Sequence, residues 1–468
     1  MPAPDPGIFR EYDIRGIAGQ TLHEADAAAI GHAFARRAAD RCGHPPRICV
    51  CYDGRLSSPP LQQALCAGLT QGGADVLHIG RGPTPMLYFA VHHLQADGGV
   101  MVTGSHNPPD HNGFKFMLGA HPFYGDDIRA LAQAIAAKKP ASPPAPGNIH
   151  AHDVSAAYLA ALLAAYDGGG RKLSIAWDAG NGAAGDIVSA LAARLPGTHI
   201  ALNTAIDGNF PAHHPDPTEP ENLAQLIAAV RRERCDAGIA FDGDGDRIGV
   251  VDDEGEILWG DQLLLLYAER LLAAHPGATV IADVKASQTL FDGVRALGGQ
   301  PLMWKTGHSH IKAKMKEAAA KLAGEMSGHI FFADSYYGFD DGLYAAMRLL
   351  AALSRMDRPL SAWRKALKPV FNTPELRFPC PDARKFAVIE EVRAALAAEG
   401  AEFSDVDGVR VRLPEGWWLL RASNTQAMLV ARAEAADAAG LRRVLNGLTQ
   451  ALQARGLKLP DYSPAASA

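Results

Sequence analysis

Three short apolar segments decide the fold class: RICVCYD at Arg47–Asp53, DVLHIG at Asp75–Gly80 and GVMVT at Gly99–Thr103. Each has the length of a buried strand and is followed by turn residues. Ala-rich stretches of helical length separate them, and one begins at Ser58-Pro59, an N-cap residue with proline at the first helical position. This alternation predicts an α/β unit with a mixed or parallel sheet.

The same alternation continues along the chain and predicts two more α/β units. Their strand candidates are Leu173–Asp178, His199–Asn203, Gly238–Phe241, Thr279–Val284 and Pro301–Lys305. A Pro- and Ala-rich linker at Lys138–Gly147 separates the first two units. The predicted domains are 1–150, 151–253, 254–368 and 369–468.

The last predicted domain has a different pattern. Val409, Val411 and Leu413 alternate with Arg410 and Arg412, which is typical of a half-buried strand. Ala427–Ala431 predicts a second strand, and helices are expected at about 384–398 and 436–454. We therefore expect three related mixed-sheet α/β domains and a smaller C-terminal α+β domain with an antiparallel sheet.

Composition limits the possible partners. The 468 residues carry a formal net charge of −6, so the chain has no global attraction for nucleic acid, and an anionic ligand needs a local cluster of cations. The six cysteines form no CxxC pair and predict reduced core thiols. Met1–Arg10 lacks a signal-peptide pattern, and the aliphatic run Leu263–Leu266 is too short for a membrane span. A cytoplasmic protein is expected.

The segment TGSHNPP at Thr103–Pro109 follows a predicted strand. Glycine permits an unusual backbone there, and Asn-Pro fixes the exit of the turn, so the Ser105 hydroxyl would stand on a rigid loop. A serine nucleophile needs a base, a metal or nearby cations. On its own, the segment is equally consistent with a polar turn that has no chemistry.

The segment DGDGDR at Asp242–Arg247 groups three carboxylates at alternate positions. Their mutual repulsion is relieved by a hard cation such as Mg²⁺, which prefers oxygen ligands. A calcium loop of the EF-hand type would need glycine at its sixth position and glutamate at its twelfth, where this chain has Arg247 and Asp253. A solvated acidic turn is the remaining alternative.

Two further polar segments are candidates for ligand binding. GEMSGH at Gly324–His329 offers a carboxylate, a hydroxyl and an imidazole that could bind sugar hydroxyls, or it is a plain polar turn. RASNT at Arg421–Thr425 lies between two predicted strands and suits a phosphate dianion, or it is a hairpin turn.

Three other features favour structural roles. Gly180–Gly185 matches GxGxxG but lacks an acid at a clean strand end, so we interpret it as a tight strand-to-helix turn. His213-His214 lies in a proline-rich connector. A lysine-rich stretch predicts a solvated helix face, although His308, just before it, follows a strand end. The lysines are Lys312, Lys314, Lys316 and Lys321.

The chain resembles the α-D-phosphohexomutase superfamily and its bacterial phosphomannomutase/phosphoglucomutase branch. The resemblance rests on four motifs in this order: TGSHNPPDHNGFK, DGDGDR, GEMSGH and RASNT. The resemblance extends from the segment Tyr12–Gly16 to the last domain. It implies four domains around a central cleft and transfer of a phosphoryl group between positions 1 and 6 of a hexose. It also implies one Mg²⁺, a hexose 1,6-bisphosphate intermediate and activator, and a monomer.

The resemblance also implies roles for individual residues. Ser105 would be the phosphoserine and would complete the metal shell of Asp242, Asp244 and Asp246. The implied catalytic residues beside Ser105 are His106, Lys115, Arg247 and His329, with Lys115 and His329 as candidates for proton transfer. The implied substrate-binding residues are Tyr12, Arg15, Lys285, His308, Glu325, Ser327, Arg421, Ser423, Asn424 and Thr425.

Other functions remain open at this point. A phosphoglucosamine mutase would share the same motifs, and a metal-dependent sugar phosphatase could use Ser105 and the aspartates to release phosphate. A non-catalytic phosphosugar-binding protein would not need a nucleophile beside a metal. An NAD-linked oxidoreductase rests on the GxGxxG segment alone.

Overall fold

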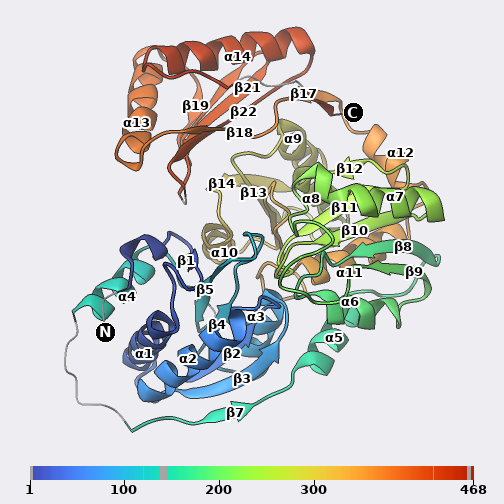
Figure 1. Ribbon diagram of the computed structural model, residues 1–468. Helices are drawn as coiled ribbons and strands as arrows, with labels where there is room; N and C mark the ends of the chain where they lie inside the picture. Colours follow the sequence, from blue (N-terminus) through green and yellow to red (C-terminus); the bar gives the residue numbers. More distant parts are fainter. Residues whose placement is uncertain (1–3, 120, 138–144, 425, 461–464, 468) are drawn as a thin grey trace.

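The computed structural model describes residues 4–119, 121–137, 145–424, 426–460 and 465–467. Thr425 and most of the predicted linker lie outside these ranges. Figure 1 shows four sheet-containing units, with the C-terminal one set above the other three. The three predicted α/β domains and the C-terminal α+β domain are therefore present, while the boundaries near 150, 253 and 368 stay predictions.

The first sheet has the strand order β1-β5-β4-β2-β3-β7, with β6 on β5. β2, β3, β4 and β7 pair in parallel, whereas β5 pairs antiparallel with β1, β4 and β6. The elements are η1 (Pro6–Ile8), β1 (Ile14–Ile17), α1 (Glu24–Cys42), β2 (Arg47–Tyr52), α2 (Ser58–Gln71), β3 (Asp75–Arg81), α3 (Thr84–His93), β4 (Gly98–Val102), β5 (His111–Leu118), β6 (His121–Pro122), α4 (Asp126–Ala136) and β7 (Ile149–Ala151).

The second and third sheets share one plan, in which parallel strands end in an antiparallel edge. Their orders are β12-β11-β10-β8-β9 and β14-β13-β15-β16. The second unit contains α5 (Ser155–Ala164), β8 (Leu173–Asp178), α6 (Gly185–Ala192), β9 (Gly197–Leu202), η2 (Pro220–Leu223), α7 (Ala224–Glu233), β10 (Ala237–Phe241), β11 (Ile248–Asp252) and β12 (Ile257–Leu258). The third contains α8 (Gly260–Ala274), β13 (Thr279–Asp283), α9 (Gln288–Ala296), β14 (Gln300–Trp304), α10 (His308–Glu317), β15 (Leu322–Gly324), β16 (Ile330–Phe332), α11 (Gly342–Leu353) and α12 (Leu360–Lys365).

The fourth sheet is antiparallel throughout, in the order β19-β20-β21-β22-β17-β23 with β18 on β22. Two helices accompany it. The elements are β17 (Val370–Asn372), β18 (Leu376–Pro379), α13 (Asp382–Ala398), β19 (Phe403–Ser404), β20 (Val409–Leu413), β21 (Gly416–Ala422), β22 (Met428–Ala435), α14 (Ala438–Gln453) and β23 (Ala465–Ser467).

The packing separates the fourth domain from the rest. One continuous hydrophobic core runs through all three α/β domains, for example where Tyr88 packs beside Phe339 and where Trp177 stacks on Phe241. The fourth domain has its own core and shares with the third a small cluster around Val284 and Trp417. The first three domains are therefore joined far more extensively than the fourth is joined to them.

Arg410 differs from its predicted exposure. The alternation over 409–413 predicted a solvent-facing arginine, but the side chain is buried because it lies at the boundary with the third domain. Its guanidinium donates to the Val284 carbonyl oxygen at 3.1 Å and lies 3.8 Å above the Trp417 ring. The third domain therefore covers the second face of β20 at Arg410, whereas Arg412 on the same face is exposed.

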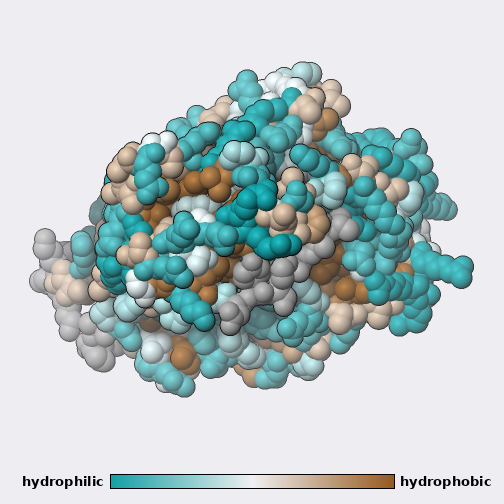
Figure 2. Space-filling model, turned by 90° about the horizontal axis from the view of Figure 1, so that it is seen from above, coloured by the Kyte–Doolittle hydropathy of each residue, from teal (hydrophilic) through white to brown (hydrophobic). Residues whose placement is uncertain are grey.

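Hydrophilic residues cover most of the face seen in Figure 2, and hydrophobic patches interrupt them. None of the helices in the described ranges combines the length and the apolar composition that a bilayer crossing requires.

Candidate active site

The loop between β4 and β5 places Ser105 in an unusual backbone conformation. Ser105 has φ of +50°, in the left-handed region that costs a non-glycine residue about 1 kcal/mol. Asp53, at the end of β2, holds the start of this loop: it accepts hydrogen bonds from Thr103 Oγ1 at 2.7 Å and from the Gly104 amide at 3.2 Å. Thr103 Oγ1 in turn accepts the Ser105 amide at 2.8 Å. These hydrogen bonds hold the backbone of Ser105 in its unfavourable conformation and so fix the position of the hydroxyl.

Arg55 fixes the rest of the loop between β4 and β5 through hydrogen bonds to its carbonyl oxygens. Its side chain is fully buried, and its guanidinium donates to the carbonyl oxygens of Ser105 and Asn107 at 2.6 Å each and of His111 at 2.9 Å, as well as to that of Pro108. A Cβ at position 104 would lie 2.5 Å from the guanidinium carbon, so Gly104 is needed for this approach. Asp53 and Arg55 stand outside the quoted motifs and were not predicted, although Asp-Gly-Arg at a strand end is a recognisable signal.

We expect Arg55→Lys to weaken both the loop and catalysis. A lysine keeps the positive charge but has no planar fork, so some of the four carbonyl oxygens lose their donors. The free energy of unfolding should fall by about 2–3 kcal/mol, and kcat should fall more than KM changes because the loop positions the Ser105 hydroxyl. Thermal unfolding and steady-state kinetics measure both effects. Arg81→Lys, at an exposed ion pair, is the matched control, and an unchanged kcat in Arg55→Lys would contradict the bracing role.

The turn between β10 and β11 brings three aspartates together. Asp242, Asp244 and Asp246 are completely buried, and one oxygen from each lies within 4.8 Å of the others. Ser105 Oγ donates to Asp242 Oδ2 at 3.0 Å, which joins the first and second domains at this point. Burial, and then the charges of Asp244 and Asp246, raises the pKa of Asp242 well above its ordinary value.

Lys115 neutralises part of this triad. The side chain comes from β5, is buried, and places Nζ 2.7 Å from Asp244 Oδ2 and in contact with Asp246. Burial alone would raise the pKa of Asp244, but Lys115 holds it below its ordinary value. Asp244 Oδ1 and Asp246 Oδ1 have no hydrogen-bond partner among the described residues. Two buried carboxylate oxygens without donors fit a cation, and the oxygen set suits Mg²⁺.

A second buried group extends from the triad into the third domain. Arg247 Nε donates to His329 Nε2 at 3.1 Å, so the proton of the neutral ring belongs on Nδ1, which lies 3.3 Å from Asp340 Oδ2. The His308 ring stacks on that of His329 at 5.4 Å, with Nδ1 3.2 Å from the same Asp340 oxygen. Lys312 Nζ lies 2.8 Å from Asp340 Oδ1.

The position of Lys312 corrects a prediction. The lysine-rich stretch was expected to be a solvated helix face, but Lys312 is on the side of α10 that faces the first domain and His329. Its Nζ is paired with the buried Asp340 and lies 4.5 Å from the centre of the Tyr88 ring. Asp340 itself was missed because it precedes a helix and belongs to no recognised motif.

The third-domain loop between β15 and β16 carries further polar residues of the site. Glu325 is buried, and its Oε1 accepts the Gly307 amide at 2.6 Å. Lys285 Nζ lies 3.0 Å from Glu375 of the fourth domain. Ser327 is half-buried on the same loop as Glu325. Carboxylate, ammonium and hydroxyl groups are thus gathered where β13 and β15 end.

The fourth-domain loop meets the other domains through Tyr12 and Asp407. Asn424 Nδ2 donates to Tyr12 Oη at 2.6 Å, and Tyr12 Oη donates to the Thr306 carbonyl oxygen at 2.9 Å. Arg421 Nε donates to Asp407 Oδ2 at 2.9 Å, and this oxygen also accepts the Thr306 amide at 3.0 Å. The first, third and fourth domains therefore meet at one place.

Three predicted residues remain to be placed. His106 Nδ1 lies 3.2 Å from Ser105 Oγ, and burial, followed by the charge of Arg247, lowers the pKa of His106 well below its ordinary value. Arg15 pairs with Asp13 at 2.5 Å and is close enough to His106 to lower that pKa further. Ser423 accepts the Gln426 amide in the fourth-domain loop at 3.2 Å.

Comparison with known proteins assigns the family. Profiles of phosphoglucomutase/phosphomannomutase match in order: alpha/beta/alpha domain I at residues 6–142, domain II at 156–255, domain III at 259–371 and the C-terminal domain at 375–450. The chain belongs to the phosphoglucomutase/phosphomannomutase family.

Individual members of the phosphoglucomutase/phosphomannomutase family are similar along almost their whole length. A phosphomannomutase/phosphoglucomutase from Pseudomonas aeruginosa is 43% identical over 463 residues, which is 98% of each chain. A phosphoglucomutase from Neisseria gonorrhoeae is 45% identical over 94% of this chain and 95% of its own. The crystal structure of a family protein from Burkholderia thailandensis, 42% identical, superposes with a TM-score of 0.89 over 98% of this chain and 99% of that one.

Side-chain contacts in the structure connect the four motifs to one another or to neighbouring domains. TGSHNPP and DGDGDR share the contact between Ser105 and Asp242, and DGDGDR reaches GEMSGH through Arg247 and His329. RASNT reaches the first domain through Asn424 and Tyr12. The GxGxxG segment is a turn that leads into α6, as interpreted from the sequence.

Proposed function

We propose that this chain interconverts hexose 1-phosphate and hexose 6-phosphate, with mannose or glucose as the hexose, by way of a phosphorylated Ser105 and a hexose 1,6-bisphosphate. The observation that carries the proposal is the contact of Ser105 Oγ with the buried aspartate triad at 3.0 Å. Phosphoryl transfer depends on positioning and on charge stabilisation rather than on covalent help. The braced loop positions Ser105. The neighbouring carboxylates with unpaired oxygens, together with Lys115 and Arg247, provide the charges that the transfer needs.

The proposed metal is one Mg²⁺, held by Asp242, Asp244, Asp246 and an oxygen on Ser105. When bound, it would neutralise charge on the transferring phosphoryl group. Burial, followed by the charges of Asp244 and Asp246, raises the pKa of Asp242, and a metal ligates the deprotonated carboxylate, so metal binding should tighten as the pH rises.

The chain's own residues account for the remaining requirements. In the first half-reaction the bond between Ser105 Oγ and phosphorus breaks, and a bond from phosphorus to the free sugar hydroxyl forms. The departing Ser105 Oγ takes up a proton, for which Lys115 is the proposed donor, and Arg247 is placed to stabilise the shared charge. The hydroxyl proton passes to His329 Nε2, which Arg247 Nε–H has to release as Arg247 turns to the phosphoryl group, while Asp340 Oδ2 stays 3.3 Å from Nδ1. The second half-reaction is the reverse, from the other end of the bisphosphate.

Substrate binding is assigned to loops of the third and fourth domains. Glu325 and Ser327 would bind sugar hydroxyls, while Arg421, Ser423, Asn424 and Thr425 would hold the phosphate group that does not react. Because either end of the sugar has to occupy this phosphate site, a loop on a separately packed domain suits the task. Contacts that avoid C2 would discriminate poorly between glucose and mannose. A monomeric cytoplasmic enzyme belongs to the same proposal.

A coupled assay tests the proposed function. The chain is supplied with glucose 1-phosphate or mannose 1-phosphate, Mg²⁺ and trace glucose 1,6-bisphosphate, and the 6-phosphates and free phosphate are measured separately. Conversion of both sugars without stoichiometric phosphate release is expected. Phosphate release without isomerisation would indicate a phosphatase, and conversion of glucosamine 1-phosphate alone would replace the proposed sugar.

We expect Tyr12→Phe to weaken substrate binding. The variant loses one hydroxyl that joins the fourth-domain loop to the first and third domains, and each neutral hydrogen bond contributes about 1 kcal/mol. KM should therefore rise roughly fivefold or more, with kcat changed less. Steady-state kinetics measures the split, with Tyr166→Phe as the control. An unchanged KM would mean that Tyr12 does not hold the substrate-binding arrangement.

A further inference from the structure

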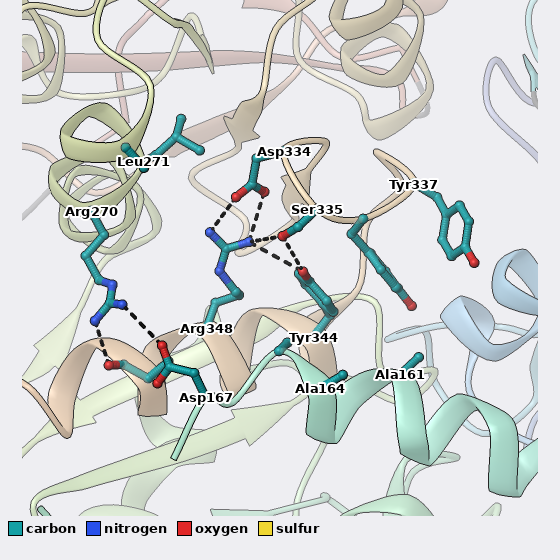
Figure 3. Close-up of a pocket in the computed structure, with 14 residues that line it drawn as sticks. Ala161, Ala164, Asp167, Arg270, Leu271, Asp334, Ser335, Tyr337, Tyr344 and Arg348 are labelled. Carbon is teal, nitrogen blue, oxygen red and sulfur yellow. Dashed lines mark hydrogen bonds and ion pairs between the residues drawn. The ribbon is translucent and has the colours of Figure 1, made fainter. Parts of the chain in front are cut away.

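A pocket lies away from the proposed catalytic residues. Its volume is about 640 Å³, and it opens between α5, α8, α11 and the loop that leads into α11 (Figure 3). None of the residues proposed for catalysis, substrate or metal is among its described lining residues. This volume is within the range of small-molecule sites.

One end of the pocket has an excess of positive charge. Arg348 pairs with Asp334 through two contacts of 2.9 Å, whereas Arg270 lies 3.8 Å from Asp167, which also pairs with Arg355. The lining itself has two arginines and two aspartates, and Arg355, which does not line the pocket, brings a third guanidinium group to the same two carboxylates. Burial, and then the charge of Arg355, lowers the pKa of Arg270. An anion at this end would relieve the repulsion, and guanidinium groups suit phosphate in particular.

The other end is aromatic on one side and lined by small residues on the other. Tyr337 and Tyr344 lie opposite Ala161 and Ala164 of α5 (Figure 3). Tyr337 is 48% exposed, and one face of its ring stacks on that of His92 at 4.5 Å. The Tyr344 ring already stacks on Tyr336 at 3.9 Å, so Tyr337 is the tyrosine beside which a flat ring can lie, and stacking on tyrosine tolerates any base.

The pocket and the catalytic group share one loop. Tyr336, which lines the pocket, donates through Oη to Asp341 Oδ2 at 2.9 Å. The preceding residue, Asp340, is the carboxylate that holds both His308 and His329. A ligand that moves Tyr336 would therefore act on a loop that positions the proposed base.

We propose that this pocket binds a nucleoside phosphate as an effector, with its phosphate groups at Arg270 and Arg348 and its base beside Tyr337. The effector role rests on the proposed mutase activity, but binding is measured without it. The probes are ADP, GDP and UDP, with inorganic phosphate and pyrophosphate as matched ligands that lack a base.

Isothermal titration of the intact chain tests binding. Saturable binding of at least one nucleoside diphosphate, tighter than that of pyrophosphate, is expected. Ala164→Phe fills the pocket from an exposed helical position, and Arg270→Gln removes one cation. Each should weaken the affinity roughly tenfold or more. Ala160→Phe, exposed on the same helix but outside the pocket, is the control and should bind normally.

Four results would overturn the proposal: no saturable binding of any of the three nucleotides, equal affinity for pyrophosphate, binding that persists in both Ala164→Phe and Arg270→Gln, or an initial mutase rate unaltered at saturating nucleotide. If the chain binds nucleotide in the expected pattern but converts no sugar phosphate in any condition, the proposed function fails rather than the site.

Discussion

Ser105→Ala is expected to lower kcat/KM for glucose 1-phosphate by roughly 10⁴-fold or more, because removal of a nucleophile leaves only the contribution of binding and charge stabilisation. The fold should survive, since the hydroxyl contacts only Asp242 and His106 among the hydrogen bonds found in the described residues. The coupled assay measures the rate, and thermal unfolding measures the stability.

Ser105→Gly is the matched variant for this experiment. It also lacks the hydroxyl, but glycine adopts positive φ freely, so its free energy of unfolding should exceed that of Ser105→Ala by about 1 kcal/mol. Both variants should be equally inactive in spite of this difference. Substantial activity in either variant would contradict the role of Ser105, whereas a rate that follows stability would point to a structural role.

Lys115→Met is expected to have the largest effect on stability. The substitution leaves Asp244 and Asp246 buried without their counter-ion, and breaking a buried pair on one side costs about 3–5 kcal/mol. Without metal, the variant should melt well below the unaltered chain. Added Mg²⁺ should raise the melting temperature of the variant more than that of the unaltered chain, because the cation takes over the neutralisation.

Thermal unfolding with and without Mg²⁺ measures this difference, and Lys172→Met, at an exposed lysine, is the control. Equal metal-induced shifts in Lys115→Met and in the unaltered chain would contradict the proposal that lysine and metal serve the same carboxylates. The activity of Lys115→Met should stay low even with Mg²⁺, since Lys115 is also proposed to act beside the transferring group.

The sequence was informative where chemistry is concentrated in short segments. The residue types in the motifs indicate the chemistry, and the structure brings these motifs together. They contain Ser105, the three aspartates, Arg247 and His329. The strands before the motifs of Ser105 and Asp242 were equally predictable, because each is an apolar run that ends in a turn, whereas β15 before GEMSGH was not predicted. Leu173–Asp178 has the bounds that were predicted.

The supporting residues were less predictable because their roles depend on tertiary contacts. Arg55 and Asp340 lie outside the motifs, and only the folded chain shows that each contacts several catalytic segments. The exposure of Lys312 and Arg410 was predicted wrongly for a related reason. The spacing of apolar residues distinguishes the two faces of one helix or strand, but it does not reveal that another domain covers the polar face at these positions.

The most direct test of the central claim is to isolate the phosphoenzyme. The chain is incubated with glucose 1,6-bisphosphate and Mg²⁺, freed from ligand, and analysed by intact and peptide mass spectrometry before and after addition of glucose 1-phosphate. We predict one phosphoryl group, on the peptide that contains Ser105, which disappears as glucose 1,6-bisphosphate is formed. A phosphoryl group on another residue, or one that leaves as free phosphate without reaching the sugar, would contradict the account.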